Sequence, residues 1–353
     1  MVSVRSRLAL AILLTGCALG ARAQEQRPSA LGLTLNLPAD TGSPGRRRAV
    51  EEARRSGVSM FGLSISWSEG EPAPRQYRID EVARTARLLR QSGAVLHLDV
   101  PLVTAAFRDV PEDLRERAFD DPRLTIRLGR FLESLEPALL DFATLSLGYE
   151  ADSYFSEKPG ELRAYRRLVE GAVLFLGKRV PHLRVGVTTL APTESRAPEI
   201  AAALHASSPV LFYIYAPILP GSTFLHRPPE DLERDWKNLL EAARGRPIAF
   251  PEISYSSAAE NGSDPARQAD FIRRLRRAVA SADGDRLLFA RYVPLRDPPS
   301  AEVPPTMGFS ESARRRTIFL ANRGLQLVDG RAKPAWREWL RAAGSSPADK
   351  IRR

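Results

Sequence analysis

The sequence has few of the residues on which several common kinds of chemistry depend. Cys17 is the only cysteine, so the chain can form no internal disulfide. Only four of its 353 residues are histidine, and His182, His205 and His226 show no metal-ligand spacing. There is no G-x-S-x-G segment, and no Gly-rich phosphate fingerprint follows the first predicted strand. These absences argue against a disulfide scaffold, a serine hydrolase with a nucleophile elbow and a dinucleotide-binding sheet.

Lysine is also scarce, and the positive charge comes almost entirely from arginine. Only five of the 52 basic residues are lysine, against 42 acidic residues, which gives a net charge of +10. The arginines are scattered along helical patterns and do not cluster with aromatic residues, so no nucleic-acid partner is expected. A solvated basic surface is expected instead, and such a surface favours anionic glycans.

The apolar segment near the N-terminus, residues 8–20, is too short to span a bilayer and follows Arg5 and Arg7, as in a secretory signal. Two processing sites overlap there. Residues 21–23 (ARA) fit a cleavage site that leaves Gln24 first, whereas residues 14–17 (LTGC) resemble a lipobox in which Cys17 is lipidated. Both remain open, and the position of Cys17 slightly favours the lipobox. We predict export, either as a periplasmic or outer-membrane lipoprotein held to the membrane through Cys17, or as a secreted protein.

Short apolar runs then alternate with amphipathic stretches along one long domain. The predicted strands are 31–37, 60–66, 95–100, 142–148, 183–189, 210–215, 247–253 and 287–293. The predicted helices are 46–55, 79–91, 122–140, 161–179, 198–206, 229–243, 265–280 and 311–322. Eight strand–helix units in succession predict a single-domain α/β fold, a (β/α)8 TIM barrel. We assign residues 1–23 to the signal peptide, 24–30 to a linker, 31–342 to the barrel and 343–353 to a disordered tail.

The alternation within the strands predicts which side chains point into the barrel. In the fourth strand the inward face carries Thr144, Ser146, Gly148 and Glu150, opposite Leu145 and Leu147. The first strand places Thr34 and Asn36 inward, and the third places His97 and Asp99 inward. Polar residues therefore gather at the carboxyl ends of the strands, where the active sites of this fold lie.

Two glutamates are the candidate catalytic residues. Glu150 ends the fourth strand, and Glu252 ends the seventh, on the face that alternation assigns to Ile248 and Phe250. A retaining glycosidase needs two such carboxylates about 5–5.5 Å apart, one as nucleophile and the other as acid and then base. A lone glutamate at a strand end is more often an ordinary surface carboxylate, but two at corresponding ends favour the catalytic interpretation.

Four segments, in order, resemble the clan A retaining glycoside hydrolases. They are residues 67–72 (WSEGEP) with 76–80 (QYRID), 148–155 (GYEADSYF), 251–257 (PEISYSS), and 324–325 (GL) with 329–336 (DGRAKPAW). The resemblance covers residues 31–340 and implies a (β/α)8 barrel without a cofactor. It also implies that Glu150 is the acid/base and Glu252 the nucleophile. In the family an asparagine precedes the acid/base and holds the substrate 2-hydroxyl, whereas this chain has Tyr149.

Several other residues are candidates for binding sugar. The resemblance implies a tyrosine of the sixth strand that hydrogen-bonds the nucleophile, and Tyr215 matches it better than Tyr213. The remaining substrate-binding candidates are Asn36, Trp67, Asp99, Tyr149, Tyr154 and Arg291. An ion pair is the alternative for Arg291, packing inside the protein is the alternative for the aromatic residues, and Phe224 is expected to be a buried loop anchor.

Three functions are therefore in competition. The first is retaining hydrolysis of a β-linked polysaccharide or oligosaccharide. The second is a barrel that binds glycans without hydrolysing them, which is suggested by Tyr149 at the position where the family has asparagine. The third is a metal-dependent hydrolase built on His97 and Asp99, for which no second ligand pair is found, so no metal is assigned.

Overall fold

The computed structural model describes residues 30–36, 42–219, 224–303 and 310–343. The predicted signal peptide, Cys17, residues 24–29 of the predicted linker and residues 344–353 of the predicted tail lie outside them. Within the described ranges, no helix is both long and apolar enough to cross a bilayer.

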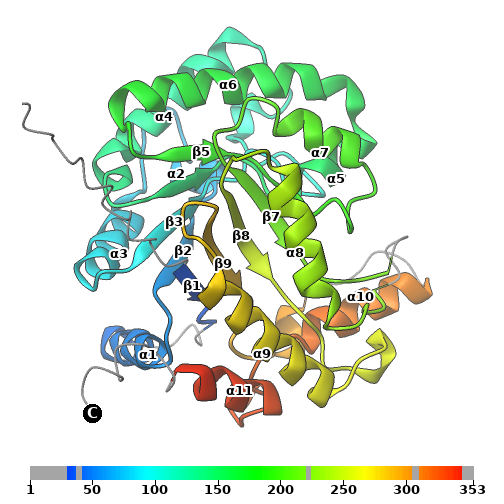
Figure 1. Ribbon diagram of the computed structural model, residues 1–353. Coiled ribbons are helices and arrows are strands. Elements are labelled where there is room, and N and C mark those ends of the chain that lie inside the picture. The colour runs from blue at the N-terminus through cyan, green and yellow to red at the C-terminus, as the bar shows by residue number, and fades with distance from the viewer. Residues whose placement is uncertain (1–29, 37–41, 220–223, 304–309, 344–353) are drawn as a thin grey trace, which may run out of the picture.

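Parallel strands form one sheet at the centre of the molecule (Figure 1), with the order β5-β4-β3-β2-β1-β9-β8-β7-β6. Their bounds are β1 Ala30–Leu33, β2 Met60–Ser64, β3 Val95–Asp99, β4 Thr144–Ser146, β5 Arg184–Gly186, β6 Thr188–Leu190, β7 Leu211–Tyr215, β8 Ile248–Ile253 and β9 Leu287–Tyr292. The fifth predicted strand is split at Val187 into β5, which pairs with β4, and β6, which pairs with β7. The sheet therefore closes through Val187, and the predicted (β/α)8 barrel is confirmed.

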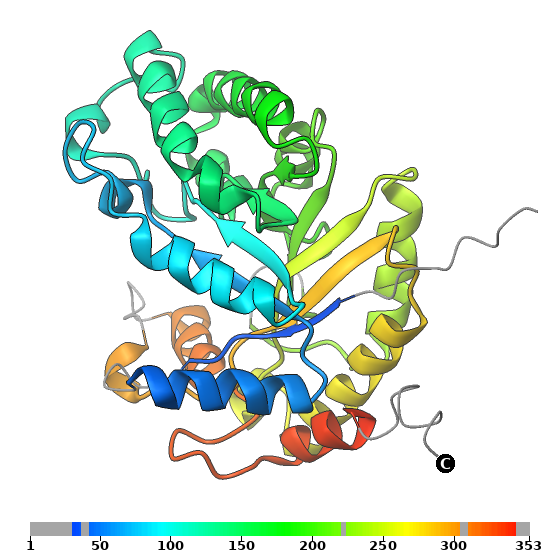
Figure 2. The same cartoon turned by 90° about the vertical axis from the view of Figure 1, so that its left-hand side faces the viewer.

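Helices surround the barrel on its outside (Figures 1 and 2). Their bounds are α1 Ser43–Arg55, α2 Trp67–Gly70, α3 Asp80–Gln91, α4 Pro122–Leu139, α5 Ala151–Glu157, α6 Leu162–Arg179, α7 Pro198–Leu204, α8 Asp231–Ala242, α9 Pro265–Ser281, α10 Glu311–Ala321 and α11 Pro334–Ala343. The eight predicted helices are present, and α2, α5 and α11 were not predicted. Helix α11 packs on α9, and Trp339 Nε1 donates to Ser56 Oγ (3.2 Å) at the end of α1.

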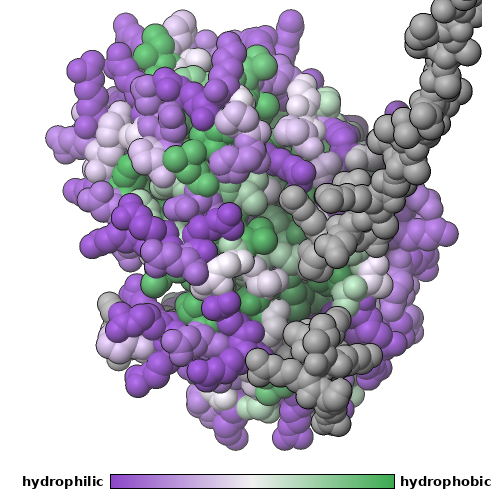
Figure 3. Space-filling view, turned by 60° about the vertical axis from the view of Figure 1, so that its left-hand side comes forward, coloured by the Kyte–Doolittle hydropathy of each residue, from purple (hydrophilic) through white to green (hydrophobic). Residues whose placement is uncertain are grey.

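The main core lies between the strands and the helices. In α4 the buried residues follow the helical repeat and face inward, as the amphipathic pattern predicts: Leu124, Leu128, Phe131, Leu132 and Leu135. Figure 3 shows that the outer surface seen in that view is mostly hydrophilic, with isolated hydrophobic side chains. Burial of the apolar helix faces against the strands thus holds the helices around the barrel.

A second, smaller apolar cluster fills one end of the barrel interior. It consists of Ala30, Met60, Val210, Phe212, Ala249 and Phe289. The His97 ring lies 5.2 Å from the rings of Phe212 and Phe289, and its nitrogens contact Thr144 Oγ1 (2.8 Å) and Asp99 Oδ1 (3.0 Å). The inward direction predicted for the third and fourth strands is therefore confirmed. A hydrogen-bonded polar layer separates the apolar cluster from the carboxyl ends of the strands.

Candidate active site

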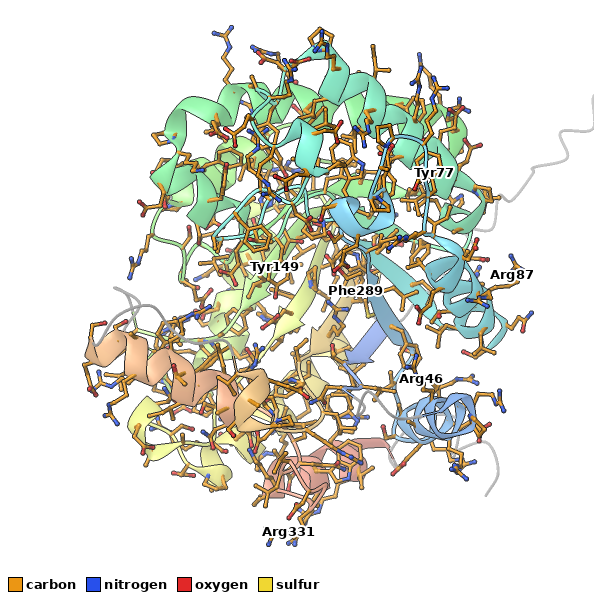
Figure 4. The ribbon with its side chains drawn as sticks, turned by 180° about the vertical axis from the view of Figure 1, so that it is seen from behind. Arg46, Tyr77, Arg87, Tyr149, Phe289 and Arg331 are labelled. Atoms are coloured by element: carbon orange, nitrogen blue, oxygen red, sulfur yellow. The ribbon has the colours of Figure 1, made fainter. Side chains whose placement is uncertain are left out.

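A cavity of about 500 Å³ lies at the carboxyl ends of the strands. Its wall includes residues from the ends of β4 and β8, from the loops after β6 and β7, and from one side of α10. Both predicted catalytic residues, Glu150 and Glu252, line it. Helix α10, drawn in orange in Figures 1 and 4, lies beside this mouth of the barrel. The position at the C-terminal face of the strands is where (β/α)8 barrels carry their active sites.

Glu150 occupies a sharp junction between strand and helix. Its backbone has φ 50° and ψ 40°, the left-handed region, and α5 begins at the next residue, Ala151. A non-glycine residue in this conformation costs about 1 kcal/mol or more, and such strained residues cluster at functional sites. The turn lets the Glu150 side chain line the cavity instead of continuing the alternation of β4.

The environment of Glu150 favours its protonated form. Burial, followed by the negative charge of Glu252, raises the pKa of Glu150 to about 7, against the smaller opposing effect of Arg316. A carboxyl group with this pKa is protonated in a substantial fraction of molecules near neutral pH, which general acid catalysis requires. Both glutamates line the same cavity, and the charge of Glu252 is the second cause of the raised pKa of Glu150.

Glu252 reaches the cavity by a route that strand alternation does not predict. Phe250 stacks on Trp236 of α8 (4.7 Å between rings), and Ala249 belongs to the cluster inside the barrel, so Phe250 faces outward. The expectation that Glu252 shares an inward face with Ile248 and Phe250 is therefore wrong. Between Phe250 and Ile253, β8 has one residue more than either neighbouring strand. This bulge reverses the alternation and turns Glu252 inward.

Both carboxylate oxygens of Glu252 are hydrogen-bonded. Arg323 Nη1 donates to Oε1, and the Tyr149 hydroxyl donates to Oε2. Tyr149, labelled in Figure 4, lies on the same side of the barrel as α10. Burial, followed by the charges of Glu252 and Glu150, holds the pKa of Tyr149 well above its ordinary value, so its hydroxyl remains a donor. Tyr149 thus directly contacts the residue predicted to be the nucleophile.

The two tyrosines of β7 do not contact Glu252. The Tyr215 hydroxyl donates to Asp235 Oδ2 of α8 (2.9 Å), and the Tyr213 ring packs edge-on against His205. Both face the helices, because Phe212 of the same strand belongs to the cluster inside the barrel and alternation puts its neighbours outside. The hypothesis that Tyr215 bonds the nucleophile is therefore wrong, and the hydroxyl on Glu252 comes from Tyr149.

Three further predicted sugar-binding residues belong to the framework of the protein. Trp67 is fully buried, and its Nε1 donates to Glu71 Oε2 (3.0 Å). Tyr154 is also buried, with its hydroxyl donating to Glu161 Oε2 (3.0 Å). Asn36 holds the loop after β9 through two hydrogen bonds with the Arg296 backbone (2.8 and 2.9 Å). None of the three lines the cavity.

Asp99 and Arg291 pair with each other inside the barrel. Arg291 Nη2 lies 3.4 Å from Asp99 Oδ2, and its Nε donates to the Pro251 carbonyl. The guanidinium passes over Gly62, where an added Cβ would lie 1.4 Å from Arg291 Nη1, so a larger residue at this position would displace the guanidinium. The ion-pair alternative for Arg291 is thus correct. In the described part of the chain, no group of three His, Cys, Asp or Glu residues could hold a metal ion.

Sequence reasoning did not single out Arg316 and Arg323, which line the cavity, and for Phe224 it favoured a buried loop anchor over a sugar-stacking role. Phe224, expected to be a buried anchor, lines the cavity and packs against Phe319 of α10 (5.7 Å between rings). An aromatic face of this kind suits the apolar face of a sugar ring. Arg323 stands immediately before the segment 324–325 (GL), which was the only signal near it.

Comparison with known proteins finds solved structures that share this fold. No family model matches the chain, and no curated protein matches its sequence. The GH5_18 protein of Streptomyces cattleya, solved with GlcNAc, is similar over 91% of this chain and 82% of its own, with a TM-score of 0.70 and 15% identity. A variant of it was solved with Manβ1-4GlcNAc.

Two other solved structures agree. The exo-β-1,4-mannosidase of an Opitutaceae bacterium has a TM-score of 0.61 at 15% identity, over 92% of this chain and 61% of its own. A family 39 glycoside hydrolase of Bacteroides cellulosilyticus has a TM-score of 0.61 at 14% identity, over 91% and 64%. This protein has the barrel fold of the clan A glycoside hydrolases. At such low identities the likeness establishes the fold alone.

The raised pKa of Glu150 leads to a first prediction. In Glu252→Gln one negative charge is removed, so the pKa of Glu150 should fall from about 7 towards its ordinary value while burial keeps it above that value. Carboxyl 13C NMR of both proteins measures this directly. An exposed control, Glu241→Gln on α8, should leave the titration unchanged. An unaltered Glu150 pKa in Glu252→Gln would show that the two carboxylates do not interact.

Proposed function

We propose that this protein is a retaining glycoside hydrolase that cleaves a β-linked oligosaccharide or polysaccharide. The observation that carries the proposal is the pair of glutamates in one cavity, with the pKa of Glu150 raised to about 7 and Glu252 held by two donors. One carboxyl is adapted to give a proton and the other to act as an anion, the division of roles that this mechanism needs.

The first chemical step forms a covalent intermediate. A carboxylate oxygen of Glu252 attacks the anomeric carbon, the glycosidic C–O bond breaks, and Glu150 gives its proton to the leaving oxygen. Arg323 and Tyr149 orient the attacking group through their hydrogen bonds. As the Glu252 charge is consumed, its effect in raising the Glu150 pKa disappears, so Glu150 stays ionised and is able to accept a proton in the next step.

The second step releases the sugar. The Glu150 carboxylate takes a proton from a water molecule, the water oxygen attacks the anomeric carbon, and Glu252 leaves as carboxylate. The anomeric configuration is inverted twice and so retained. No cofactor takes part, and every proton moved is accounted for by Glu150.

Hydrolysis of a panel of aryl β-glycosides and β-linked oligosaccharides, Manβ1-4GlcNAc among them, tests the proposal. Proton NMR of the first sugar released should show the β anomer. Release of the α anomer would contradict the retaining mechanism, and no turnover on the whole panel would contradict the proposed activity.

A glycan-binding barrel without hydrolysis is the second candidate, and one contact favours it. The Tyr149 hydroxyl donates to Glu252 Oε2, so this side chain contacts the proposed nucleophile in the structure instead of being free to bind a substrate hydroxyl. Tyr149 also stands where the clan A resemblance implies an asparagine for the substrate 2-hydroxyl. Binding of glycans without turnover would identify this function.

We also propose that the protein is exported, on the basis of the N-terminal segment described above. Mass spectrometry of the N-terminal peptide from membrane and soluble fractions tests this. A diacylglyceryl group on Cys17 or a first residue of Gln24 supports export, and an intact Met1 contradicts it.

A further inference from the structure

Arg316 is a cation of the cavity wall whose guanidinium forms no ion pair with an acidic side chain of the described residues. It lies on α10, is half-buried and lines the cavity with the two glutamates. Its guanidinium also has no hydrogen bond within the described ranges, whereas Arg314 and Arg315 beside it pair with Glu311 at 2.8 and 3.2 Å. The acidic residue of this helix is thus engaged by the neighbours of Arg316.

The other charges around the cavity are largely compensated within the protein. Glu194 accepts from Arg227 (3.1 Å), Asp152 accepts from the Leu190 amide (3.0 Å) and from Ser195, and Glu252 accepts from Arg323. Burial, the first cause, raises the pKa of Glu194 well above its ordinary value, against the opposing effect of Arg227. An incoming anion would therefore meet Arg316 without a strongly charged acid bound to it.

Arg316 lines the same cavity as both proposed catalytic residues. Its charge opposes the burial and the Glu252 charge that together raise the pKa of Glu150. A substrate group bound to Arg316 would consequently belong to one of the sugars that flank the bond being cleaved. A guanidinium presents a planar fork of donors that fits a carboxylate in a bidentate manner.

We propose that Arg316 binds the carboxylate of a uronic acid, so that the substrate of this barrel is an acidic glycan. The inference rests on the proposed glycosidase function and specifies its substrate class. A bound carboxylate would neutralise the positive charge of Arg316, whereas a neutral glycan would leave this charge without a partner. A sulfate ester is the other common anionic group of glycans, and a guanidinium can bind its oxygens too, so the experiment below compares the two.

The experiment compares a uronic-acid-containing β-linked oligosaccharide with the neutral oligosaccharide obtained from it by carboxyl reduction. For the wild type, kcat/KM should be higher on the acidic form. In Arg316→Ala it should fall about 10- to 100-fold on the acidic form, mainly through KM, and little on the neutral form, the loss expected for a charged hydrogen-bonded pair. Arg316→Lys should recover part of the kcat/KM lost on the acidic form. Arg314→Ala, an exposed variant of the same helix, should behave as wild type.

Equal loss on both oligosaccharides in Arg316→Ala, no loss on either, or a wild-type preference for a sulfated oligosaccharide would overturn the proposal. Binding measured by calorimetry in Glu252→Ala separates it from the proposed function. If nothing is hydrolysed but the acidic oligosaccharide binds in an Arg316-dependent manner, the proposed substrate class is supported and the proposed hydrolysis is contradicted. If neutral glycosides are hydrolysed and Arg316 has no effect, the proposed hydrolysis is supported and the proposed substrate class is contradicted.

Discussion

Replacing Glu252 by alanine is expected to lower kcat/KM by about 10⁴- to 10⁶-fold on every glycoside, the range seen when a nucleophile is removed. Replacing Glu150 by alanine is expected to cost about 10²- to 10⁴-fold, and only on substrates whose leaving group needs a proton. On aryl glycosides with good leaving groups, Glu150→Ala should form the covalent intermediate at nearly the normal rate and then release it slowly. Kinetics on aryl glycosides of graded leaving-group pKa measure the difference.

Azide gives this first prediction a direct control. A small anion can enter the space left by Glu150→Ala and attack the intermediate in place of water, so azide should accelerate turnover and yield a β-glycosyl azide. Glu241→Ala, on the exposed side of α8, should retain wild-type activity. If the two cavity variants lose activity equally on all substrates and azide rescues neither, the assigned roles are wrong.

The second prediction concerns the hydroxyl that Tyr149 places on Glu252. Tyr149→Phe removes one of the two donors that orient the carboxylate, and kcat/KM should fall about 10- to 100-fold, as for the loss of a charged hydrogen bond. Tyr149→Asn keeps a donor and introduces the residue that the clan A resemblance implies for the substrate 2-hydroxyl. It should therefore keep or raise turnover.

Steady-state kinetics on one β-glycoside, with a glycan-binding measurement in parallel, distinguish the outcomes. A rise in activity for Tyr149→Phe would mean that the hydroxyl restrains Glu252. If wild type and Tyr149→Asn both bind glycans but hydrolyse none of a broad panel, the protein is a binding barrel.

Much of the barrel was predictable because strand–helix alternation is a local property of the chain. Each predicted strand overlaps an observed one, although the fifth is broken at Val187 and β1, β2 and β4 are shorter than predicted, and the inward faces of β3 and β4 are as predicted. The alternation of β4 also led to Glu150, although the residue reaches the cavity through a left-handed turn. Local pattern could thus identify the end of the strand where the glutamate stands.

The position of Glu252 was predicted for a reason that proved wrong. Simple alternation would have placed it outside with Phe250, and the additional residue in β8 turned it inward. A bulge is visible only when a strand is compared with the strands that pair with it. For β7 the resemblance implied that Tyr215 reaches the nucleophile, but Phe212 lies inside the barrel, so Tyr213 and Tyr215 face the helices.

By itself, the sequence determined the order of strands and helices, the end of the barrel at which polar residues gather, and the two glutamates of the cavity. Only the tertiary structure decided what touches them. Tyr149 and Arg323 lie 103 and 71 residues from Glu252 along the chain, yet both donate to its carboxylate. Contacts at such separations depend on how the strands pair and on where α10 lies beside the mouth of the barrel. Hydropathy periodicity within one segment carries no information about either.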